Sequence, residues 1–326
     1  MDTVLLNAKE VEGLISIEDI VDAVREGFKA YSQGKVAQPP IVSIETDNGG
    51  EVDFKTGYSR QEEIIGFKMA GGFWDNPKKY DLASTIAMIC LFDGKNGVPI
   101  CVMDGTLITA YRTAAAGALG AICLARKNSR RAAVIGTGAQ ARMQIRALEK
   151  FFPLEEVSVY GRSRCEAYVE EMSALLPRIE FTAKQTVKEA VEDADIIVTA
   201  TAGRQALVMD EWIKPGTHIN AIGCDMEGKQ ELDPEIFRRA KVVNDSREEC
   251  VKRGETQHAF RKGYLEENEI YGEIGEILLG EKKGRISDEE ITIFDATGMS
   301  VQDINSALFL YRKALRQNVG RRIDVI

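Results

Sequence analysis

The segment AAVIGTGAQAR at residues 132–142 constrains the fold more than any other part of the chain. An apolar run leads there into Gly136, Gly138 and Ala141, which form the pattern G-x-G-x-x-A at the start of a helical segment. The first glycine of this pattern permits a tight turn, the second lets a pyrophosphate approach the backbone, and the small third residue allows close packing of helix on strand. Free N–H groups at the helix start favour phosphate. The segment therefore predicts a dinucleotide-binding unit.

Two different patterns divide the chain around this segment. From about residue 118 to residue 300, stretches typical of strands and of helices alternate, which predicts a parallel sheet with helices on both faces. Before them lie an amphipathic helical stretch at Ser16–Tyr31 and short β-branched or aromatic stretches typical of antiparallel strands, and an amphipathic helix follows them. We therefore predict an α/β protein. A Rossmann-type doubly wound parallel sheet, residues 118–300, is inserted in a second, α+β domain made of residues 1–117 plus 301–326.

The segment VYGRSR at residues 159–164 marks the end of the second predicted strand of the dinucleotide unit. An acidic residue there would bind the ribose hydroxyls of NAD and repel the additional phosphate of NADP. The sequence has no acid at this place and offers Arg162, Ser163 and Arg164, whose guanidinium and hydroxyl groups suit a dianion. We therefore expect NADP(H) as the cofactor, with NAD(H) as the alternative if the arginines only face solvent.

Composition and charge exclude several classes of partner. The formal net charge is -9 and the basic residues are interspersed with acids, so no nucleic-acid surface is predicted. The apolar runs are shorter than the roughly 20 residues of a membrane span and the N-terminal stretch lacks a secretory pattern, so we expect a cytoplasmic protein without a membrane partner. The six cysteines lack CxxC spacing, His218 lies in a predicted strand, and His258 is isolated, so no metal site is predicted.

Several segments together resemble the ornithine cyclodeaminase/mu-crystallin family. They are GFKMAGGFWDNP, FDGKNGVPICVMDGTLITAYRTAAAGALGA, AAVIGTGAQAR, ADIIVTATAG, HINAIGCDMEGKQEL and IFDATGMSVQD, which follow the family's order and spacing over nearly the whole chain. The resemblance implies a homodimer in which the N-terminal domain forms the dimer interface and the substrate site. It also implies that the Rossmann domain binds a nicotinamide cofactor, and that the substrates are small amino acids, amines or their imino counterparts.

The same resemblance implies roles for residues at matching positions. Lys68 would contact the substrate carboxylate or polarise its carbonyl or imine, Arg112 would lie between substrate and cofactor, and Asp225 would be the catalytic acid or base. Lys68 and Asp225 are thus the predicted catalytic residues, and Lys68 and Arg112 the predicted substrate-binding residues. Taken without the resemblance, the two cations could also lie at the surface and Asp225 could be a loop acid. The predicted cofactor-binding residues are Thr85, Arg112, Thr113, Gly136, Gly138, Ala139, Gln140, Arg162, Ser163, Arg164, Thr201, Lys229 and Gly298.

Two positions depart from the family pattern. Ile41 follows the QPP segment, where members that act on α-amino acids have an arginine that clamps the carboxylate, and Thr56-Gly57 stands in place of a Met-Pro pair. Loss of a bidentate arginine removes an oriented contact, for which Lys55 or Arg60 could substitute. The departures argue against ordinary ornithine cyclodeaminase activity.

The sequence therefore predicts an NAD(P)-dependent oxidoreductase acting on the CH–NH or CH–NH2 group of an amino acid or imine. It would be an imino-acid or ketimine reductase or an amino-acid dehydrogenase. Hydride would pass between the nicotinamide and the substrate α-carbon, with Asp225 carrying the proton. Two alternatives stay open: an ornithine/lysine-type cyclodeaminase that uses bound NAD, and a non-catalytic, NADPH-dependent small-ligand-binding protein like mu-crystallin. The presence of both Lys68 and Asp225 favours the enzyme.

Overall fold

The computed structural model describes residues 2–325, and the chain separates into two compact units. The first unit contains the chain as far as Arg112 and again from Met299 onward, and the second unit is Thr113–Gly298. The predicted domain limits, after residues 117 and 300, lie a few residues further along, inside helices α4 (Thr106–Leu124) and α11 (Ser300–Gln317). Helix α4 therefore continues from the first unit into the second.

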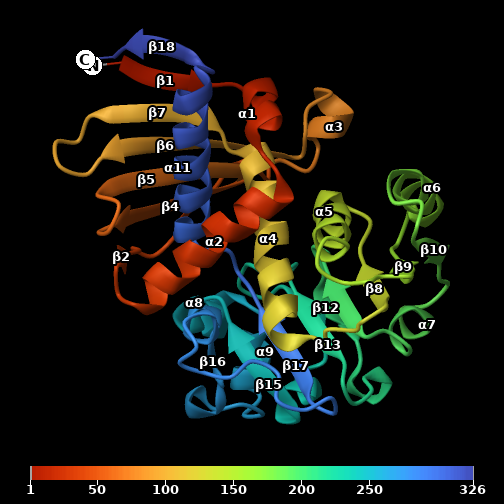
Figure 1. Ribbon diagram of the computed structural model, residues 1–326. Helices are drawn as coiled ribbons and strands as arrows, with labels where there is room; N and C mark the ends of the chain where they lie inside the picture. The colour runs from red at the N-terminus through yellow and green to blue at the C-terminus, as the bar shows by residue number, and fades with distance from the viewer. Residues whose placement is uncertain (1, 326) are drawn as a thin grey trace. The chain divides into compact units, whose positions relative to one another are not determined.

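One mixed sheet forms the centre of the first unit (Figure 1). Its strand order is β18-β1-β7-β6-β5-β4-β2, with β3 paired to β4, and only β1 and β7 run parallel. The strands are β1 (Asp2–Leu6), β2 (Val36–Ala37), β3 (Val42–Glu45), β4 (Glu51–Ser59), β5 (Ile64–Gly72), β6 (Thr85–Asp93), β7 (Pro99–Asp104) and β18 (Arg321–Asp324).

Helices cover one face of this sheet. They are α1 (Ala8–Leu14), α2 (Ile17–Ser32) and α11, and α2 and α11 cross the sheet on the same side (Figure 1). The short helix α3 (Asn76–Lys79) lies between β5 and β6 in the chain. The predicted helix at Ser16–Tyr31 corresponds to α2, and the Ser16 hydroxyl caps it by accepting from the Asp19 N–H at 3.2 Å. Helix α11 lies so close to β5 that a Cβ on Gly66 would come within 2.7 Å of Ile304.

The opposite face of this sheet is apolar, and we call it the open face. Register places Met69 of β5 directly across from Met88 of β6, with 37% and 43% of their surfaces exposed. The rings of Phe67 and Phe92 stack on the same side, with centroids 5.9 Å apart. The other exposed apolar side chains of the open face are Val42, Ile44, Ile65 and Ile86.

A wholly parallel sheet forms the second unit, as the alternation of patterns predicted. Its order is β10-β9-β8-β11-β13-β17-β15-β16, so the direction of winding reverses between β8 and β11, where open α/β sheets bind ligands. A separate pair, β12 (Arg204–Val208) and β14 (Gln230–Leu232), lies outside this order. The sheet strands are β8 (Arg131–Ile135), β9 (Glu156–Tyr160), β10 (Glu180–Ala183), β11 (Ile196–Thr199), β13 (His218–Ala221), β15 (Ala240–Asn244), β16 (Gly272–Glu273) and β17 (Ile291–Asp295).

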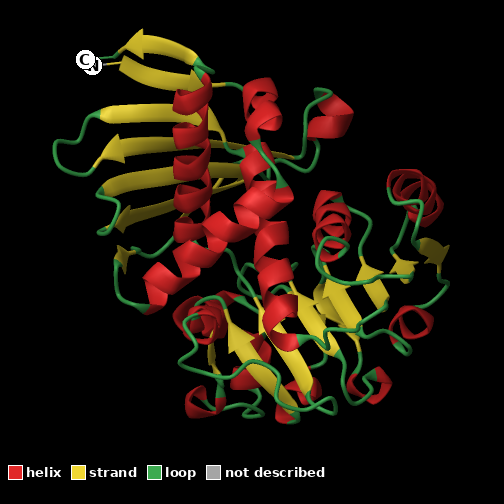
Figure 2. Cartoon of the chain, viewed as in Figure 1, coloured by secondary structure: helices red, strands yellow, loops and turns green. Residues whose placement is uncertain are grey.

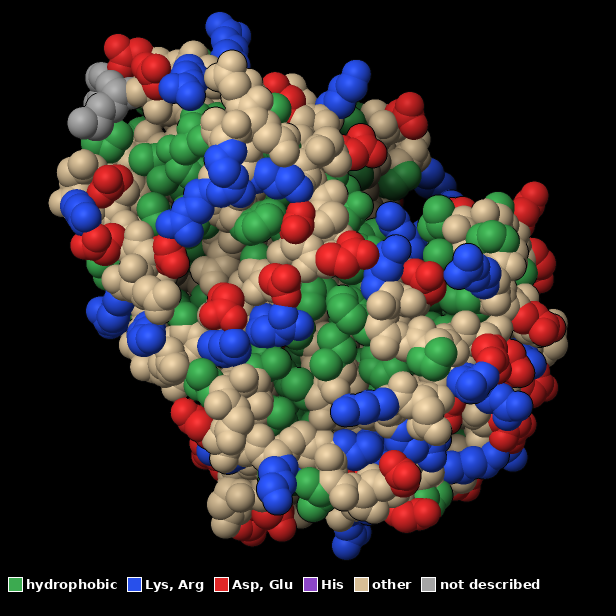
Figure 3. Space-filling model, viewed as in Figure 1, with side chains coloured by type: hydrophobic (Ala, Val, Ile, Leu, Met, Phe, Trp, Pro, Cys, Tyr) green, Lys and Arg blue, Asp and Glu red, His purple; other side chains and the backbone are tan. Residues whose placement is uncertain are grey.

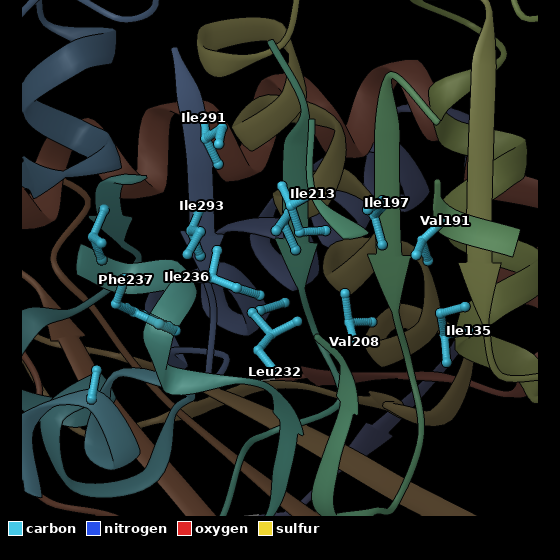
Figure 4. Packing of buried hydrophobic residues seen from close by; sticks show 14 of the residues in the cluster. Ile135, Val191, Ile197, Val208, Ile213, Leu232, Ile236, Phe237, Ile291 and Ile293 are labelled. Atoms are coloured by element: carbon cyan, nitrogen blue, oxygen red, sulfur yellow. The ribbon is translucent and has the colours of Figure 1, made fainter. Parts of the chain in front are cut away.

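Helices lie on both faces of this parallel sheet (Figure 2). Strands covered on both faces are hydrophobic throughout, and β11 and β13 are buried at every position. On one face Ile135, Ile197 and Ile293 pack with Leu232 and Phe237 (Figure 4). The helices are α4, α5 (Ala139–Leu148), α6 (Cys165–Leu175), α7 (Val187–Val191), α8 (Arg247–Arg253), α9 (Thr256–Arg261) and α10 (Ile274–Leu278). The 3-10 helices are Asp210–Trp212, Pro234–Arg238 and Glu267–Glu269.

Helix α4 is long and apolar enough to cross a membrane, but most of it is buried within the protein. Its small residues explain this burial. A Cβ on Gly120 would lie 2.3 Å from the ring of Phe294 in β17, so only glycine allows the helix this close to the strand. We therefore identify α4 as a core helix. Lysine, arginine and acidic side chains are interspersed on the face of the molecule drawn in Figure 3.

Candidate functional site

The glycine-rich turn between β8 and α5 has the geometry of a pyrophosphate site. Gly136 has φ +123°, and a Cβ there would lie 2.5 Å from the Ala200 carbonyl oxygen, so no other residue fits. Gly138 caps α5 and has open space where a Cβ would stand, and both Gly138 and Ala139 are exposed. The Gln140 Oε1 atom is buried without a hydrogen-bond partner among the described residues. The N–H groups at the start of α5, the free space beside Gly138 and the unpaired Gln140 oxygen fit a bound dinucleotide.

Two side chains hold this turn in place from behind. The Tyr168 hydroxyl donates to the Ala141 carbonyl at 3.1 Å, and burial raises the pKa of that phenol. The Arg142 guanidinium lies 4.9 Å from the centre of the Tyr168 ring, pairs with Glu171 at 2.7 Å and donates to the Gly138 carbonyl at 3.1 Å. The turn is thus rigid before any ligand arrives, which lowers the entropic cost of binding.

The three predicted phosphate-binding residues follow β9 at the surface. Arg162, Ser163 and Arg164 are all exposed. The Thr137 hydroxyl of the glycine-rich turn donates to the Ser163 carbonyl at 3.0 Å, so the two loops are neighbours. Arg164 adopts a left-handed conformation, φ 64°, as it caps α6. Among the described residues none forms an ion pair with Arg162 or Arg164, and the loop can therefore offer both guanidinium groups to an anion.

A buried carboxylate, Glu231, ties together two loops at the carboxyl edge of the sheet. Its Oε1 accepts from the Thr201 N–H at 2.6 Å, after β11, and its Oε2 accepts from the Gly223 N–H at 3.0 Å, after β13. Thr201 is a predicted cofactor residue, and Gly223 stands two positions before Asp225. Glu231 itself is fully buried in β14. It therefore fixes the spacing of the two loops that carry predicted site residues.

Two further buried carboxylates continue the same arrangement. Glu255 accepts from the backbone N–H groups of Glu231 at 2.5 Å and Leu232 at 3.1 Å. Asp295, at the end of β17, accepts from the N–H groups of Glu255 at 3.1 Å and Thr256 at 2.9 Å. Asp295 thus holds the backbone of Glu255, Glu255 holds the backbone of Glu231, and Glu231 holds the two loops. We call Glu231, Glu255 and Asp295 the carboxylate relay.

The relay carries fewer than three negative charges near neutral pH. Burial raises the pKa of Glu231 to about 7, although the hydrogen bonds that it accepts lower the pKa in part. Burial likewise raises the pKa of Asp295 to about 7. For Glu255 burial and then the charges of its two relay neighbours raise the pKa well above its ordinary value. Protons are therefore retained inside the relay at a pH where exposed carboxyls have lost theirs.

The predicted catalytic acid or base, Asp225, forms an ion pair with Lys229. The Lys229 Nζ lies 2.7 Å from Asp225 Oδ1, and the Lys229 and Asp225 side chains are 12% and 46% exposed. The surrounding loop is held by backbone contacts, since Arg253 donates to the Asp225 carbonyl at 3.1 Å and His258 Nε2 lies 2.6 Å from the Lys229 carbonyl oxygen. The half-exposed carboxylate is thus placed on an ordered loop with a cation beside it.

Two other predicted cofactor residues of this unit are fixed by their backbones. The Gly298 N–H donates to Asp245 at 2.8 Å, and its φ of +82° favours glycine. The Thr113 carbonyl accepts from the Gln144 side-chain amide at 2.9 Å. Gly298, in a loop, and Thr113, in α4, are therefore held by side chains from other parts of the unit.

One histidine of this unit is buried in the parallel sheet. His218 lies inside β13, hydrogen-bonded to Thr292 and Asn220, and burial lowers its pKa to about 3. Among residues 2–325 no cluster of three or more His, Cys, Asp or Glu side chains could hold a metal. His218 is therefore a structural residue of the sheet.

In the first unit the two predicted substrate-binding cations meet on one carboxylate. Lys68 Nζ donates to Asp303 Oδ1 at 2.8 Å and to the Thr109 hydroxyl at 3.2 Å. Arg112 Nε donates to the same Asp303 oxygen at 3.0 Å, and its Nη1 donates to Gln302 Oε1 at 2.8 Å. All three charged side chains are buried. We call Lys68, Arg112 and Asp303 the cation cluster.

The charges of the cluster shift one another's pKa. Burial and then the charge of Arg112 lower the pKa of Lys68 from 10.5 to about 7, against the attraction of Asp303. Burial alone would raise the pKa of Asp303, but Arg112 and Lys68 outweigh it and hold that pKa below its ordinary value. Asp303 Oδ2 has no hydrogen-bond partner among the described residues. In the cluster two cationic groups therefore bind one carboxylate oxygen, and the other oxygen, Asp303 Oδ2, is still able to accept a hydrogen bond.

Thr85, a predicted cofactor residue of the first unit, lies outside the cation cluster. It begins β6 opposite Gly72, further along the strand pair than Lys68. Conversely, sequence patterns assigned no role to Asp303, Gln302 or Glu231. All three lie in the segments SVQD and GKQEL, where polar residues stand next to apolar ones. A polar residue in such a place is a signal of a partnered group.

Comparisons with known proteins agree with this arrangement. The family model described as "Ornithine cyclodeaminase/mu-crystallin family" matches residues 1–318. An alanine dehydrogenase of Archaeoglobus fulgidus is 41% identical over 99% of this chain and 98% of its own. The solved dimer of an archaeal alanine dehydrogenase with bound NAD has a TM-score of 0.93 at 39% identity, covering all of both chains. A Delta(1)-pyrroline-2-carboxylate reductase of Thermococcus litoralis, solved with NADH and L-proline, has a TM-score of 0.94 at 35% identity, covering 98% and 100%.

Replacing Glu231 by Gln is expected to change how stability depends on pH. A raised pKa means that the folded chain binds more protons than the unfolded chain between about pH 4.5 and 7, so this group's contribution to stability falls as pH rises through that range. The Glu231→Gln variant should lack this slope, up to about 1.4 kcal/mol per pH unit. Urea unfolding of both proteins at several pH values measures the difference.

The matched control is Glu227→Gln, an exposed carboxylate of the neighbouring loop that pairs with Arg261. It should keep the wild-type slope. An unchanged slope in Glu231→Gln would contradict the buried, proton-retaining relay. Hydrogen exchange at Thr201 and Gly223 should also accelerate in that variant, because an amide cannot accept from both N–H groups through two oxygens as the carboxylate does.

Proposed function

Because this chain belongs to the ornithine cyclodeaminase/mu-crystallin family, we propose that it interconverts an α-imino acid and the corresponding amino acid, with the cation cluster holding the substrate carboxylate. As predicted, it is an NAD(P)-dependent oxidoreductase acting on the carbon–nitrogen bond of an imine or amino acid. The observation that carries the proposal is the buried cation cluster. Two cations on one carboxylate form a preorganised site for a small anion.

Lys68 and Arg112 are the proposed substrate-binding residues. Asp303 fixes both from the side of α11, so neither has to be ordered when the substrate binds. Lys68 has a pKa of about 7, so it can bind the carboxylate as a cation or donate a hydrogen bond to the imine nitrogen and recover its proton. An anionic substrate will raise that pKa and favour the cation.

Asp225 is the proposed proton carrier. The nicotinamide cofactor, when bound, supplies or takes the hydride at the substrate α-carbon. When hydride adds to the carbon of the imine, the electron pair of the C=N bond moves to nitrogen and takes up a proton. Asp225 is half-exposed on an ordered loop, and the Lys229 ammonium lies 2.7 Å from its Oδ1. The carboxylate relay keeps this loop in place through Gly223.

NADP(H) is the proposed preferred cofactor. The exposed guanidinium groups of Arg162 and Arg164 and the absence of an acid after β9 support it. The similar solved structures contain NAD or NADH, so within the family this choice would be made by the residues of this loop. A cytoplasmic location, where NADPH is made available, belongs to the same proposal.

A homodimer formed through the open face of the first unit is also proposed. The similar alanine dehydrogenase is a dimer, and a monomer rarely leaves a contiguous apolar face in water. The open face offers Val42, Ile44, Ile65, Met69, Ile86 and Met88.

Replacing Asp225 by Asn should abolish turnover but leave the cofactor in place. We expect kcat to fall by roughly 10²–10⁴-fold, the usual contribution of a positioned acid or base, with cofactor affinity within about threefold. The assay follows nicotinamide absorbance with pyruvate and ammonia, 1-pyrroline-2-carboxylate, ornithine and lysine. Unchanged turnover would remove Asp225 from the mechanism.

The same panel of substrates separates the alternatives. Cyclisation of ornithine or lysine without net change in the nicotinamide would support a cyclodeaminase. Tight NADPH binding with no turnover of any substrate would support a binding protein.

Replacing Arg162 and Arg164 by Ala should weaken NADPH binding and spare NADH. Removing each charge-assisted hydrogen bond to the phosphate should raise the Kd for NADPH about ten- to hundredfold. Calorimetric titration of both cofactors measures this, with Arg178→Ala, an exposed arginine of the same unit, as the control. Equal affinity of the wild type for NADH and NADPH would contradict the preference.

Replacing Met88 by Glu should convert the dimer into a monomer. The substitution places a charge in the middle of the open face, where association would bury it. Sedimentation or light scattering should give half the wild-type mass. Ile286→Glu, at an exposed apolar residue of the second unit, should leave the mass unchanged, and a dimeric Met88→Glu variant would contradict the interface.

A further inference from the structure

The loop that carries Asp225 closes as a β-turn directly after this residue. The Lys229 N–H donates to the Met226 carbonyl at 3.2 Å. Gly228, the third of the four residues of the turn, has φ +78°, a left-handed conformation that favours glycine. The ion pair between Asp225 and Lys229 spans this turn. The direction of the Asp225 carboxylate therefore depends on the shape of the turn.

One buried side chain of α9, Gln257, is hydrogen-bonded to two backbone groups of the turn. Its Oε1 accepts from the Gly228 N–H at 2.9 Å, and its Nε2 donates to the Met226 carbonyl at 3.2 Å. The same nitrogen donates to the Gly254 carbonyl at 2.9 Å. Gln257 has no exposed surface, and burial of an amide costs free energy unless its polar atoms are paired. The oxygen and the nitrogen of this amide are both paired with backbone groups.

Helix α9 holds Gln257 in a fixed place. Its first residue, Thr256, donates to Asp295 Oδ2 from the backbone N–H at 2.9 Å and from the hydroxyl at 2.7 Å. Asp295 ends β17, so the helix starts from the parallel sheet. The residue after Gln257, His258, donates from Nε2 to the Lys229 carbonyl at 2.6 Å, because a carbonyl oxygen can only accept. Two consecutive side chains of α9 therefore bind the backbone of the turn.

We propose that Gln257 is a positioning residue for the proton transfer, which holds the turn after Asp225 and so orients the carboxylate toward the substrate nitrogen. This inference rests on the proposed role of Asp225. Proton transfer needs the two heavy atoms within about 2.6–3.2 Å of each other, so a small shift of the turn moves the carboxylate out of range. The half-exposed ion pair with Lys229 cannot hold the turn alone, because ion pairs in contact with water contribute little.

Replacing Gln257 by Met removes these hydrogen bonds and keeps a side chain of similar length. We expect kcat for 1-pyrroline-2-carboxylate to fall about ten- to hundredfold, since a misplacement of about 1 Å can cost about that much. The KM for the imine and the Kd for NADPH should stay within about threefold, because no proposed binding residue is altered. Arg261→Met is the matched control and should behave as the wild type, since it removes only an exposed ion pair between α9 and Glu227 of the same turn.

A double-mutant cycle with Asp225→Asn shows whether Gln257 acts through Asp225. In the Asp225→Asn background, Gln257→Met should lower kcat by less than about threefold, because the proton carrier is already lost. A further loss of the full size in that background would overturn the inference. A Gln257→Met variant that is less stable towards urea but keeps the wild-type kcat would overturn it too, because the residue would then be structural.

A second variant, Gln257→Glu, keeps the oxygen that accepts from the Gly228 N–H and loses at least one donor. It should retain a larger share of kcat than Gln257→Met. If Gln257→Met does not fold, Gln257→Glu takes its place in the cycle with Asp225→Asn, where the same two outcomes apply.

Hydrogen exchange tests the inference without turnover. With NADPH bound, the Gly228 amide should exchange at least about tenfold faster in Gln257→Met than in the wild type, because its acceptor is gone. Arg261→Met should exchange at the wild-type rate. If the wild type reduces no imine, the proposed function fails, and exchange then decides the role of Gln257 separately. Faster exchange supports the hold on the turn, and equal rates overturn it.

Discussion

One carboxylate, Asp303, makes the buried charges of the first unit possible. Lys68 and Arg112 come from different elements, β5 and α4, and both donate to the same Asp303 oxygen. Removing one partner of such a buried set costs about 3–5 kcal/mol, because the remaining charge is left without compensation in a medium that solvates it poorly. Asp303 therefore orders both cations and fixes α11 against the sheet. The stability of this unit and the proposed substrate binding depend on the same contact.

In the second unit, buried carboxylates accept hydrogen bonds from buried backbone N–H groups. Loops after parallel strands have N–H groups that no ladder satisfies, and a buried N–H without a partner is costly. Glu231 satisfies two such donors, at Thr201 and Gly223, while Glu255 and Asp295 accept from two backbone N–H groups each and hold Glu231 and Glu255 in turn. The loops that carry Thr201 and Asp225 therefore have a fixed spacing.

The sequence predicted the parts of the molecule that follow from local rules. Apolar periodicity and the Gly136–Gly138 turn indicated the parallel sheet, the place of the cofactor turn and the helix at α2, because each depends on neighbours in the chain. Local patterns could not pair Lys68 with Asp303, which are far apart in the sequence, nor show that Glu231 reaches two loops. Those contacts depend on strand order and on the packing of α11, which no local pattern encodes.

The buried titratable groups fall into two sets, those with a pKa far from neutrality and those with a pKa near it. His218 and Cys101 pack inside the sheets, and burial moves their pKa to about 3 and about 12, so neither changes its charge near neutrality. Lys68 and Glu231 are also fully buried, and burial moves the pKa of each to about 7, from above for Lys68 and from below for Glu231, although Asp303 and the backbone donors oppose the shift. A group that exchanges a proton at neutral pH needs a pKa near that value. In both units the residues that show it lie in the candidate site or directly behind it.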